Sequence, residues 1–569
     1  MRRLLQPGTG TQVLLILLLA LGTWGGSIAR GGFSYDDREV ITDNPVIEGG
    51  VVWTEALTQD YWHHIGDAGH WRPAATLSLR VDHFFYGKDP TGYHITNTLL
   101  HLLVVGLAAA ALLLIRRPGD SRWPLYGLAL FAAHPVLADS VAWMSGRTSM
   151  MSAIGGLIGV IGIASIARRN PEQRTTAASA IWVISIAGVL LALTGKEDGV
   201  VFGPLYALLA LRISKRAALA SVVGTFVAVG LWMMFRAQAL GEAFPSAPHA
   251  TLAGMPFFER MAISGSAVVQ AVRMVLLPVD YPPSFSAAGL DPVGGVAGIL
   301  LSCAGWLVLA VMGIGGLILV LRRRGQDVGA SALMVAIAAL PMMQIIPIGE
   351  ILAPRFLYLP LLLAIPLVHA TWVALFPRDH TRFAFAALLL ACCVPLAWER
   401  AGVYASRGSY WTEVLAHYPE DERAWNAIGN ARLELGDVDG AKDAWIQAAQ
   451  LDPQYSRPFV NLGTVYHREK RYEEALEWYE IAISVGKDNP NALANYGRVL
   501  MHLERMDESI AAYKKAVRIA PGRAAIRAGL GRAQLKAGEY KAAEHNLRKA
   551  RKMNPNDAST DKLIRERFE

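Results

Sequence analysis

Residues 96–115 read TNTLLHLLVVGLAAAALLLI, and two arginines, Arg116 and Arg117, follow directly. No Asp, Glu, Lys or Arg interrupts the run. A helix of about 20 mostly apolar residues is long enough to cross the hydrocarbon core of a bilayer. The stretch therefore predicts a transmembrane helix and places the chain among integral membrane proteins.

The same signal recurs through the first 400 residues. The chain has 569 residues, of which 53% are hydrophobic and 18% are charged, whereas roughly a quarter of a soluble protein is charged. We predict an all-α, polytopic membrane helix bundle of about eleven spans, and we expect its shorter spans to be tilted, broken or re-entrant. The predicted spans are 11–29, 96–115, 123–138, 151–167, 177–194, 199–213, 217–235, 293–321, 328–347, 356–376 and 381–398.

The composition changes near residue 400, so we expect a membrane domain over 1–400 and a second domain over 401–569. In the second domain Gly429, Gly463, Gly497 and Gly531 recur 34 residues apart. A period of 34 with small residues where two helices approach is typical of tetratricopeptide (TPR) repeats. We predict a TPR α-solenoid of about four repeats over 422–555, preceded by a half-repeat at 410–419. Such an array can hold acceptor protein or a partner enzyme, or form a homodimer contact.

Basic residues in short loops predict the orientation, because such loops remain in the cytoplasm. All of them fall on one side if the segment 256–277, which carries Glu259, Arg260 and Arg273, does not cross. The TPR domain then lies outside, and we expect a multi-pass protein of a bacterial inner membrane with a periplasmic TPR domain. If 256–277 does cross, the TPR domain changes sides. The basic residues are Arg2, Arg3, Arg116, Arg117, Arg122, Arg168, Arg169, Arg174, Arg212, Lys215, Arg216, Arg322, Arg323, Arg324, Arg378 and Arg382.

Polar residues are predicted to gather on the outer side. Ionisable groups at membrane depth are costly, and several that converge indicate an active site. Transfer from a lipid-linked phosphate needs such a set, because a carboxylate can take a proton from an acceptor hydroxyl and cations can hold the leaving phosphate. The set contains Asp36, Asp37, His94, Asn97, His101, His134, Asp139, Arg147, Lys196, Glu197, Asp198, Glu350 and Arg355.

A series of motifs resembles one known family, the transmembrane-and-TPR O-mannosyltransferases and their bacterial relatives. The chain shares their order and their TPR tail. The motifs are FSYDDREVITDNP (33–45), WRPAATLSL (71–79), GYHITNTLLH (92–101), HP (134–135), VAWMSGR (141–147), GKE (195–197) and RFLYLP (355–360).

This resemblance implies a GT-C glycosyltransferase fold and transfer of a sugar from a polyprenyl-phosphate donor to protein Ser or Thr on the outer face. It maps the family's acidic motif onto Asp36 and Asp37 and its motif arginine onto Arg355. We expect Arg147 and Lys196 to help bind the donor phosphate. We expect four further residues to line the site: His94, Asn97, Glu197 and Glu350.

Several alternatives remain open at this point. The acidic pair could simply form a turn or helix cap, and Arg147 and Arg355 could anchor the chain at the interface. His94, Asn97 and His101 share a helix face and could hydrogen-bond neighbouring helices. The sequence does not decide which aspartate acts as base, although we slightly prefer Asp37. We predict no cofactor and no metal, since no ligand spacing demands one.

Two rival functions also remain. One is an O-antigen-ligase-like transferase, against which the early acidic motif argues. The other is a non-catalytic membrane-anchored TPR scaffold for envelope assembly, which needs only one span and no convergent charges. The sequence does not specify the sugar, for which mannose is one candidate, or the acceptor.

Overall fold

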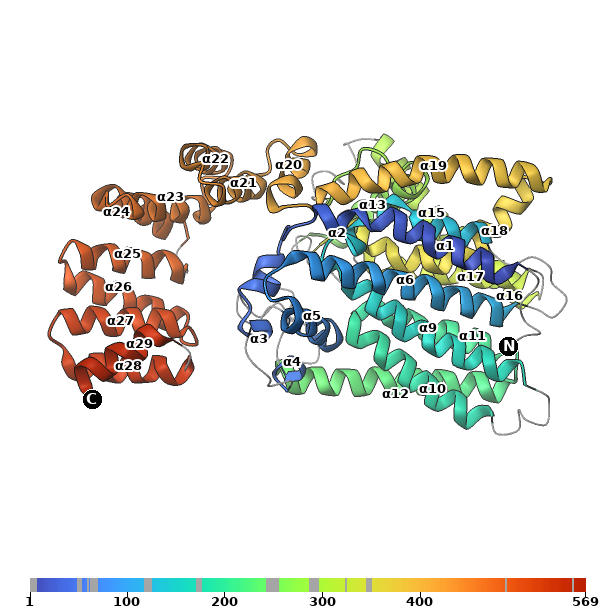
Figure 1. The fold of residues 1–569 in the computed structure, drawn as a ribbon, viewed down its shortest axis with the longest axis horizontal. Coiled ribbons are helices and arrows are strands. Elements are labelled where there is room, and N and C mark those ends of the chain that lie inside the picture. The colour runs from blue at the N-terminus through green and yellow to red at the C-terminus, as the bar shows by residue number, and fades with distance from the viewer. Residues whose placement is uncertain are drawn as a thin grey trace. The chain divides into compact units, whose positions relative to one another are not determined.

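The computed structural model describes residues 8–48, 54–58, 61, 70–116, 125–169, 177–241, 255–285, 296–322, 325–343, 350–486, 489–554 and 557–569. Over these residues the elements are helices, with one isolated β-bridge between Phe285 and Leu352. The chain divides into two compact units, Met1–Glu413 and Val414–Glu569, which we describe separately (Figure 1). Of the residues used for the prediction of orientation, Arg2, Arg3, Arg117, Arg122, Arg174, Arg323 and Arg324 lie outside the described residues.

Eight helical segments in the described part of the first unit are long and apolar enough to cross a membrane. They account for eight of the predicted spans. They are Thr9–Arg30 (α1 and α2), Pro90–Ile115 (α6), Ser145–Ala167 (η3 and α9), Ala177–Gly195 (α10), Lys215–Leu240 (α12), Gly298–Leu321 (most of α15, with η6 and α16), Pro354–Leu375 (η8 and α18) and Asp379–Val403 (α19).

Three further predicted spans form shorter helices: α7 (Leu125–Ala133), α11 (Phe202–Ala210) and α17 (Gln326–Ala338). Pro135 follows α7, and a proline lacks the amide hydrogen that a continuing helix needs. The charged residues before α11 form a separate turn of 3-10 helix, Glu197–Val201. Local sequence chemistry therefore shortens two of these elements.

Helix α13 (Phe257–Leu276) is not among the eight long apolar segments. The Oγ atom of Ser302, in α15, donates to the carbonyl of Ala262, in α13, at 2.8 Å. At the other end of α13, the His134 ring Nε2 lies 3.0 Å from the Val275 carbonyl oxygen. Residue 134 directly follows α7, and these contacts favour the interpretation in which 256–277 lies across one end of the bundle.

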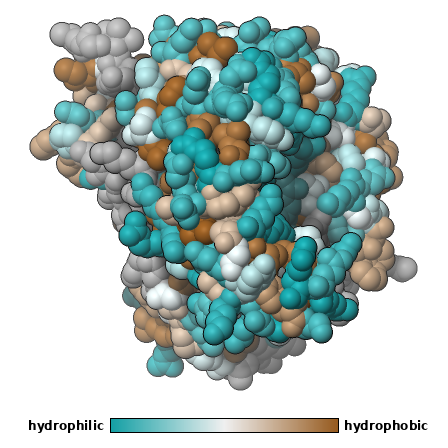
Figure 2. Space-filling model, turned by 90° about the vertical axis from the view of Figure 1, so that its left-hand side faces the viewer, coloured by the Kyte–Doolittle hydropathy of each residue, from teal (hydrophilic) through white to brown (hydrophobic). Residues whose placement is uncertain are grey.

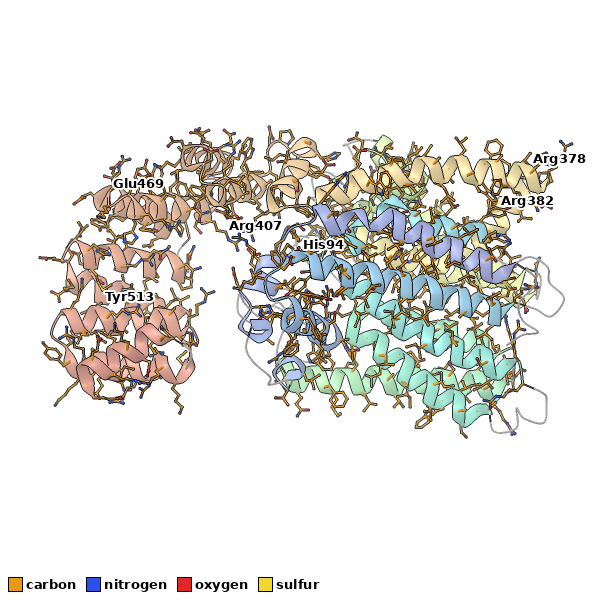
Figure 3. All side chains as sticks on the ribbon, viewed as in Figure 1. His94, Arg378, Arg382, Arg407, Glu469 and Tyr513 are labelled. Atoms are coloured by element: carbon orange, nitrogen blue, oxygen red, sulfur yellow. The ribbon has the colours of Figure 1, made fainter. Side chains whose placement is uncertain are left out.

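The first unit has two chemically different ends. Figure 3 shows His94 near one of them and Arg378 and Arg382 at the other. We call the end that holds the start of α6 the polar end and the end that holds Arg382 the arginine end. At the arginine end, arginines donate to carbonyls at or just beyond the last turns of helices: Arg168 Nε to Leu114 at 2.7 Å, and Arg382 Nη2 to Pro377 at 3.0 Å. Such carbonyls have no partner within the helix.

The second unit consists of stacked helix pairs, and it confirms the TPR prediction. In each pair a glycine of the first helix faces a large side chain of the second. A Cβ at Gly429 would lie 2.4 Å from the Trp445 ring, so only glycine fits without a shift. Figure 2 shows one face of the molecule, on which hydrophilic side chains predominate. The pairs are α21 (Glu422–Glu434) with α22 (Val438–Leu451), α23 (Ser456–Arg468) with α24 (Tyr472–Val485), α25 (Pro490–His502) with α26 (Met506–Ile519), and α27 (Ala524–Lys536) with α28 (Tyr540–Met553), followed by α29 (Ala558–Phe568).

Candidate active site

The acidic motif forms a tight loop between α2 (Gly26–Arg30) and a turn of π-helix, Arg38–Thr42. Tyr35 has a φ of 43°, which is uncommon for a residue with a side chain. Its ring packs between Tyr410, at a centroid distance of 4.5 Å, and Trp143, at 5.6 Å. Strained backbone of this kind persists only where the surroundings hold it, and it clusters at functional sites.

Asp37 is fully buried and completely hydrogen-bonded. Its Oδ2 accepts from the backbone and hydroxyl of Ser34 at 2.9 and 3.2 Å, and its Oδ1 accepts from the backbone and hydroxyl of Ser145 at 3.0 and 2.7 Å. Burial raises the pKa of Asp37 to about 6, and the hydrogen bonds oppose that rise. The carboxylate thus ties the acidic loop to the turn before α9.

Asp36 lies in different surroundings. Its Oδ1 is enclosed and has no hydrogen-bond partner among the described residues. Burial and the neighbouring Asp37 raise the pKa of Asp36 well above its ordinary value, while Arg355 acts in the opposite direction. An enclosed carboxylate oxygen without a donor is costly, and it is suited to accept a proton.

Arg355 is held at the start of α18 by two acids. The Asp139 Oδ2 accepts from the Arg355 backbone at 2.9 Å and from its Nη1 at 3.3 Å, and Nη2 pairs with Glu350. The guanidinium also lies over the Trp143 ring, 5.0 Å from its centroid. Its side chain remains 13% exposed, so this oriented cation is accessible to a small anion.

Lys196 lies beside this arginine. Its Nζ donates to the Ser149 hydroxyl at 3.1 Å and pairs with Asp198 at 3.1 Å. The Phe356 ring contacts both cations, with Lys196 Nζ at 5.2 Å and Arg355 Cζ at 5.6 Å from its centroid. Two of the three predicted phosphate-binding residues are therefore brought together.

Glu197 belongs to a neighbouring group with Arg72 and His70. Arg72 Nη2 donates to Glu197 at 3.0 Å, and the His70 ring lies 3.5 Å away. Burial alone would raise the pKa of Glu197, but Arg72 and His70 hold it well below its ordinary value. Arg72 also lies over the Tyr61 ring at 5.9 Å. We had not predicted Arg72 as a site residue, although it stands in the quoted motif 71–79.

Arg147, in contrast, is enclosed within the protein. Its Nη1 pairs with Asp82 at 2.6 Å and donates to the Ser78 hydroxyl at 2.8 Å, and its side chain has no exposed surface. Asn97 is also buried, and its Nδ2 donates to the Trp143 carbonyl at 2.8 Å. These contacts give Arg147 and Asn97 positions from which they support the turn that carries Trp143.

His94 packs beneath the glycine that opens the acidic loop. A Cβ at Gly31 would lie 2.1 Å from His94 Nε2, so this close approach needs glycine. Two turns further along α6, the His101 ring bonds the Tyr358 hydroxyl at 2.9 Å and the Ala132 carbonyl at 3.1 Å. Both histidines therefore set the packing of α6 against its neighbours.

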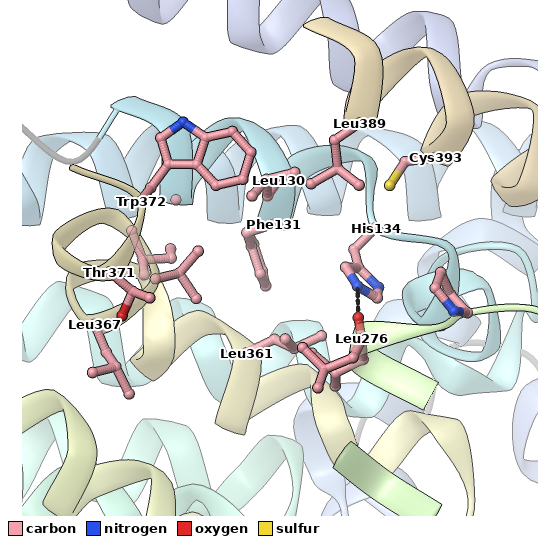
Figure 4. Close-up of a pocket in the computed structure, with 15 residues that line it drawn as sticks. Leu130, Phe131, His134, Leu276, Leu361, Leu367, Thr371, Trp372, Leu389 and Cys393 are labelled. Carbon is pink, nitrogen blue, oxygen red and sulfur yellow. Dashed lines mark hydrogen bonds between the residues drawn. The ribbon is translucent and has the colours of Figure 1, made fainter. Parts of the chain in front are cut away.

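An apolar cavity of about 370 Å³ extends from the polar end into the bundle (Figure 4). Its lining includes Phe131, Leu361 and Trp372, with His134 and its bond to Val275 at one side. Leu361 is six residues after Arg355 on the same helical segment, or about 9 Å along its axis. Asp139 follows His134 by little more than one turn. The cavity can take an apolar chain whose polar head lies near Arg355.

Among the residues that the structure describes, no group of three or more His, Cys, Asp or Glu side chains is arranged to hold a metal ion. The fold and the site together define a multi-pass helical membrane protein with a carboxylate–arginine cluster at one end of its bundle and a TPR unit after it.

Comparison with known proteins agrees with this class. The tetratricopeptide repeat family matches residues 405–456, 426–487 and 488–556. Protein O-mannosyl-transferase Tmtc2 of Drosophila melanogaster is 34% identical over 146 residues, which are 25% of this chain and 15% of that protein. Protein O-mannosyl-transferase TMTC3 of Mus musculus is 22% identical over 571 residues, covering 89% of this chain and 60% of that protein. The chain thus matches less than two thirds of the length of either relative.

Two solved structures are each similar to about a third of this chain or less. MamA is 20% identical over 27% of this chain and 90% of its own, with a TM-score of 0.24. YrrB, described as a TPR protein with an unusual peptide-binding site, is 19% identical over 34% of this chain and 97% of its own, with a TM-score of 0.25. The relatives and the repeats support the resemblance that the motifs indicate: over most of its length the chain is similar to transmembrane-and-TPR protein O-mannosyltransferases.

Proposed function

We propose that the chain is a membrane glycosyltransferase that moves a sugar from a polyprenyl-phosphate donor to Ser or Thr hydroxyls of a protein. The observation that carries the proposal is an apolar cavity lined by Leu361, which lies on the same helical segment as Arg355, whose guanidinium acts on the carboxylate of Asp36. A polyprenyl chain would occupy the cavity, and its phosphate would lie at the two cations beside Phe356.

In this mechanism Asp36 is the general base. The acceptor hydroxyl oxygen attacks the anomeric carbon of the sugar, and Asp36 Oδ1 takes the hydroxyl proton. The bond from the anomeric carbon to the phosphate oxygen breaks, and the phosphate leaves with the electron pair. Arg355 and Lys196 stabilise the negative charge that develops on the phosphate.

The other predicted residues take supporting roles. Asp37 fixes the loop that carries Asp36, and Glu350 with Asp139 orients Arg355. Glu197 and its Arg72 border the site on the side of Tyr61, where they are available to an acceptor segment. We assign Arg147, Asn97 and His94 to positioning, because each contacts buried parts of the protein.

A reconstituted assay tests the proposal. The purified protein in liposomes is given polyprenyl-phosphate mannose and a mixture of Ser- and Thr-containing peptides, and hexose transfer is followed by mass spectrometry. We expect peptides that are heavier by one hexose. If polyprenyl-phosphate glucose and other polyprenyl-phosphate sugars also give no product, the proposal fails.

We further propose that the polar end and the TPR unit share the outer side of a bacterial inner membrane. The support is the arginine end, whose basic residues belong in the cytoplasm. Alkaline phosphatase fused after Glu569 should be active, and a fluorescent protein that does not mature after export should stay dark. A bright fluorescent fusion with inactive phosphatase would reverse the orientation.

A further inference from the structure

The helices of the TPR unit divide their charges unequally. The first helices of the last three repeats, α23, α25 and α27, contain two, one and three Lys or Arg residues and no Asp or Glu. The second helix of each repeat contains at least one acidic residue; these helices are α22, α24, α26 and α28. Within the helices of the last three repeats, the acidic residues therefore lie in the second layer only.

The basic residues of the first helices come together in space. Arg468, His502 and Lys536 are the last residues of α23, α25 and α27, spaced 34 apart, and Arg498 lies one turn before His502. The rings of His467 and His502 are 5.2 Å apart. Burial, Lys536 and Arg498 lower the pKa of His502, so both cations act electrostatically on this ring. We name Arg468, Arg498 and Lys536 the cationic face.

Carboxylates do not neutralise this face. Among the described residues, Arg468, Arg498 and Lys536 form no ion pair, and Arg498 donates instead to the Asn495 amide at 2.7 Å. Arginines between the helices of a repeat do find acids, as Arg505 does with Glu508 at 2.6 Å. A position at a helix C-terminus favours a cation by itself, but Arg498 lies inside α25. The face is therefore left open to an external anion.

Amide side chains continue the same surface. Asn461 Nδ2 donates to the Oδ1 atoms of Asn426 and Asn430 at 2.9 and 3.0 Å, and Asn495 occupies the position of Asn461 one repeat later. Amides can donate to and accept from an extended backbone. The surface thus offers charge for acidic side chains and hydrogen bonds for a main chain.

We propose that the cationic face binds an acidic segment of a partner polypeptide in an extended conformation. Stacked helix pairs present an elongated concave surface, which fits a peptide better than a flat bilayer of anionic lipid. The binding does not depend on the transferase chemistry proposed above, and it would hold even if that proposal failed.

A binding measurement with the full chain in nanodiscs of neutral lipid tests this inference. The probe is a fluorescein-labelled peptide of alternating Glu and Ser, compared with a Gln–Ser peptide of the same length. The variant combines Arg468→Gln, Arg498→Gln and Lys536→Gln. The matched control removes the same charge from the exposed side of α26, with Lys514→Gln, Lys515→Gln and Arg518→Gln.

We expect the Glu–Ser peptide to bind at least ten times more tightly than the Gln–Ser peptide, and added salt to weaken it. The face variant should lose at least tenfold in affinity and the control less than twofold. Equal losses in both variants would overturn the inference. So would a face variant that keeps its peptide affinity but no longer binds phosphatidylglycerol vesicles, because the face would then be a lipid site.

Discussion

The polar end and the arginine end of the membrane unit use charge in opposite ways. At the arginine end, Arg168 and Arg382 donate to backbone carbonyls at helix ends, and their role is complete once those carbonyls are satisfied. At the polar end, Asp36 and Asp139 each keep an enclosed carboxylate oxygen without a hydrogen-bond partner. Charge that is left uncompensated inside a protein is costly. We therefore infer that the polar end carries the active site.

The largest expected effect comes from Asp36→Asn. The loss of a general base should lower kcat by roughly 10² to 10⁴-fold, with thermal stability unchanged or improved. The matched control at the arginine end is Asp379→Asn, whose exposed carboxylate pairs with Arg382, and it should stay within twofold of wild type. A fully active Asp36→Asn variant would remove the base and with it the contrast between the ends.

Arg355→Ala should raise the KM for the donor far more than the KM for the acceptor. A charge-assisted contact to phosphate is worth about 1.5–3 kcal/mol, or about 10- to 150-fold. Arg355→Lys keeps a cation beside Asp139, so its KM for the donor should lie between those of wild type and Arg355→Ala. Arg378→Ala, exposed at the arginine end, should change neither constant. Donor affinity that survives in the alanine variant would place the phosphate elsewhere.

Asp37→Asn separates structure from chemistry within the acidic pair. An amide supplies one acceptor oxygen where the carboxylate has two, each serving two donors. The variant should unfold at a lower temperature, with its free energy of unfolding reduced by about 1–3 kcal/mol. Asp36→Asn should not lower the unfolding temperature. Thermal unfolding in detergent decides between them, and equal melting temperatures for wild type and Asp37→Asn would contradict the assigned role.

The smallest expected effect is a shift in pH dependence. Arg407 Nη2 holds both oxygens of Glu39 at 2.7 and 2.8 Å. The groups that act on Asp36 are Asp37, Glu39 and Arg355, with Tyr61 nearby, and a free Glu39 anion raises the pKa of Asp36.

Because Asp36 must be ionised to accept a proton, activity falls as pH drops through its pKa. Arg407→Gln should therefore move the acid limb of the kcat/KM profile to higher pH, and Glu39→Gln should move it to lower pH. The double variant should return close to wild type. If the acid limb of the kcat/KM profile is unshifted in all three variants, Arg407 acts only through folding.

The sequence predicts the fold well because long apolar runs and a 34-residue repeat are local signals. It predicts two spans as longer than the helices that form there, since Pro135 follows the end of α7 and the charged turn Glu197–Val201 precedes the start of α11. The site is less accessible to sequence. Asp36 and Asp37 are adjacent and identical. Ser145, whose hydroxyl donates to Asp37, is 108 residues away in the sequence.

The same limit applies to the arginines. Arg147 and Arg355 both follow apolar segments, and only the fold buries Arg147 against Asp82 and leaves Arg355 13% exposed while it pairs with Asp139 and Glu350. Distant partners that satisfy a charge are not encoded near it. The sequence therefore identifies candidate groups, whereas the assignment of a role to each depends on tertiary contacts.

The most direct test of the central claim compares glycoproteomes of cells that express wild type or Asp36→Asn at equal levels. We expect peptides that carry hexose on Ser or Thr in cells with wild type, and we expect these modified peptides to be absent in cells with the variant. The same modified peptides at the same abundance in both cultures would contradict it.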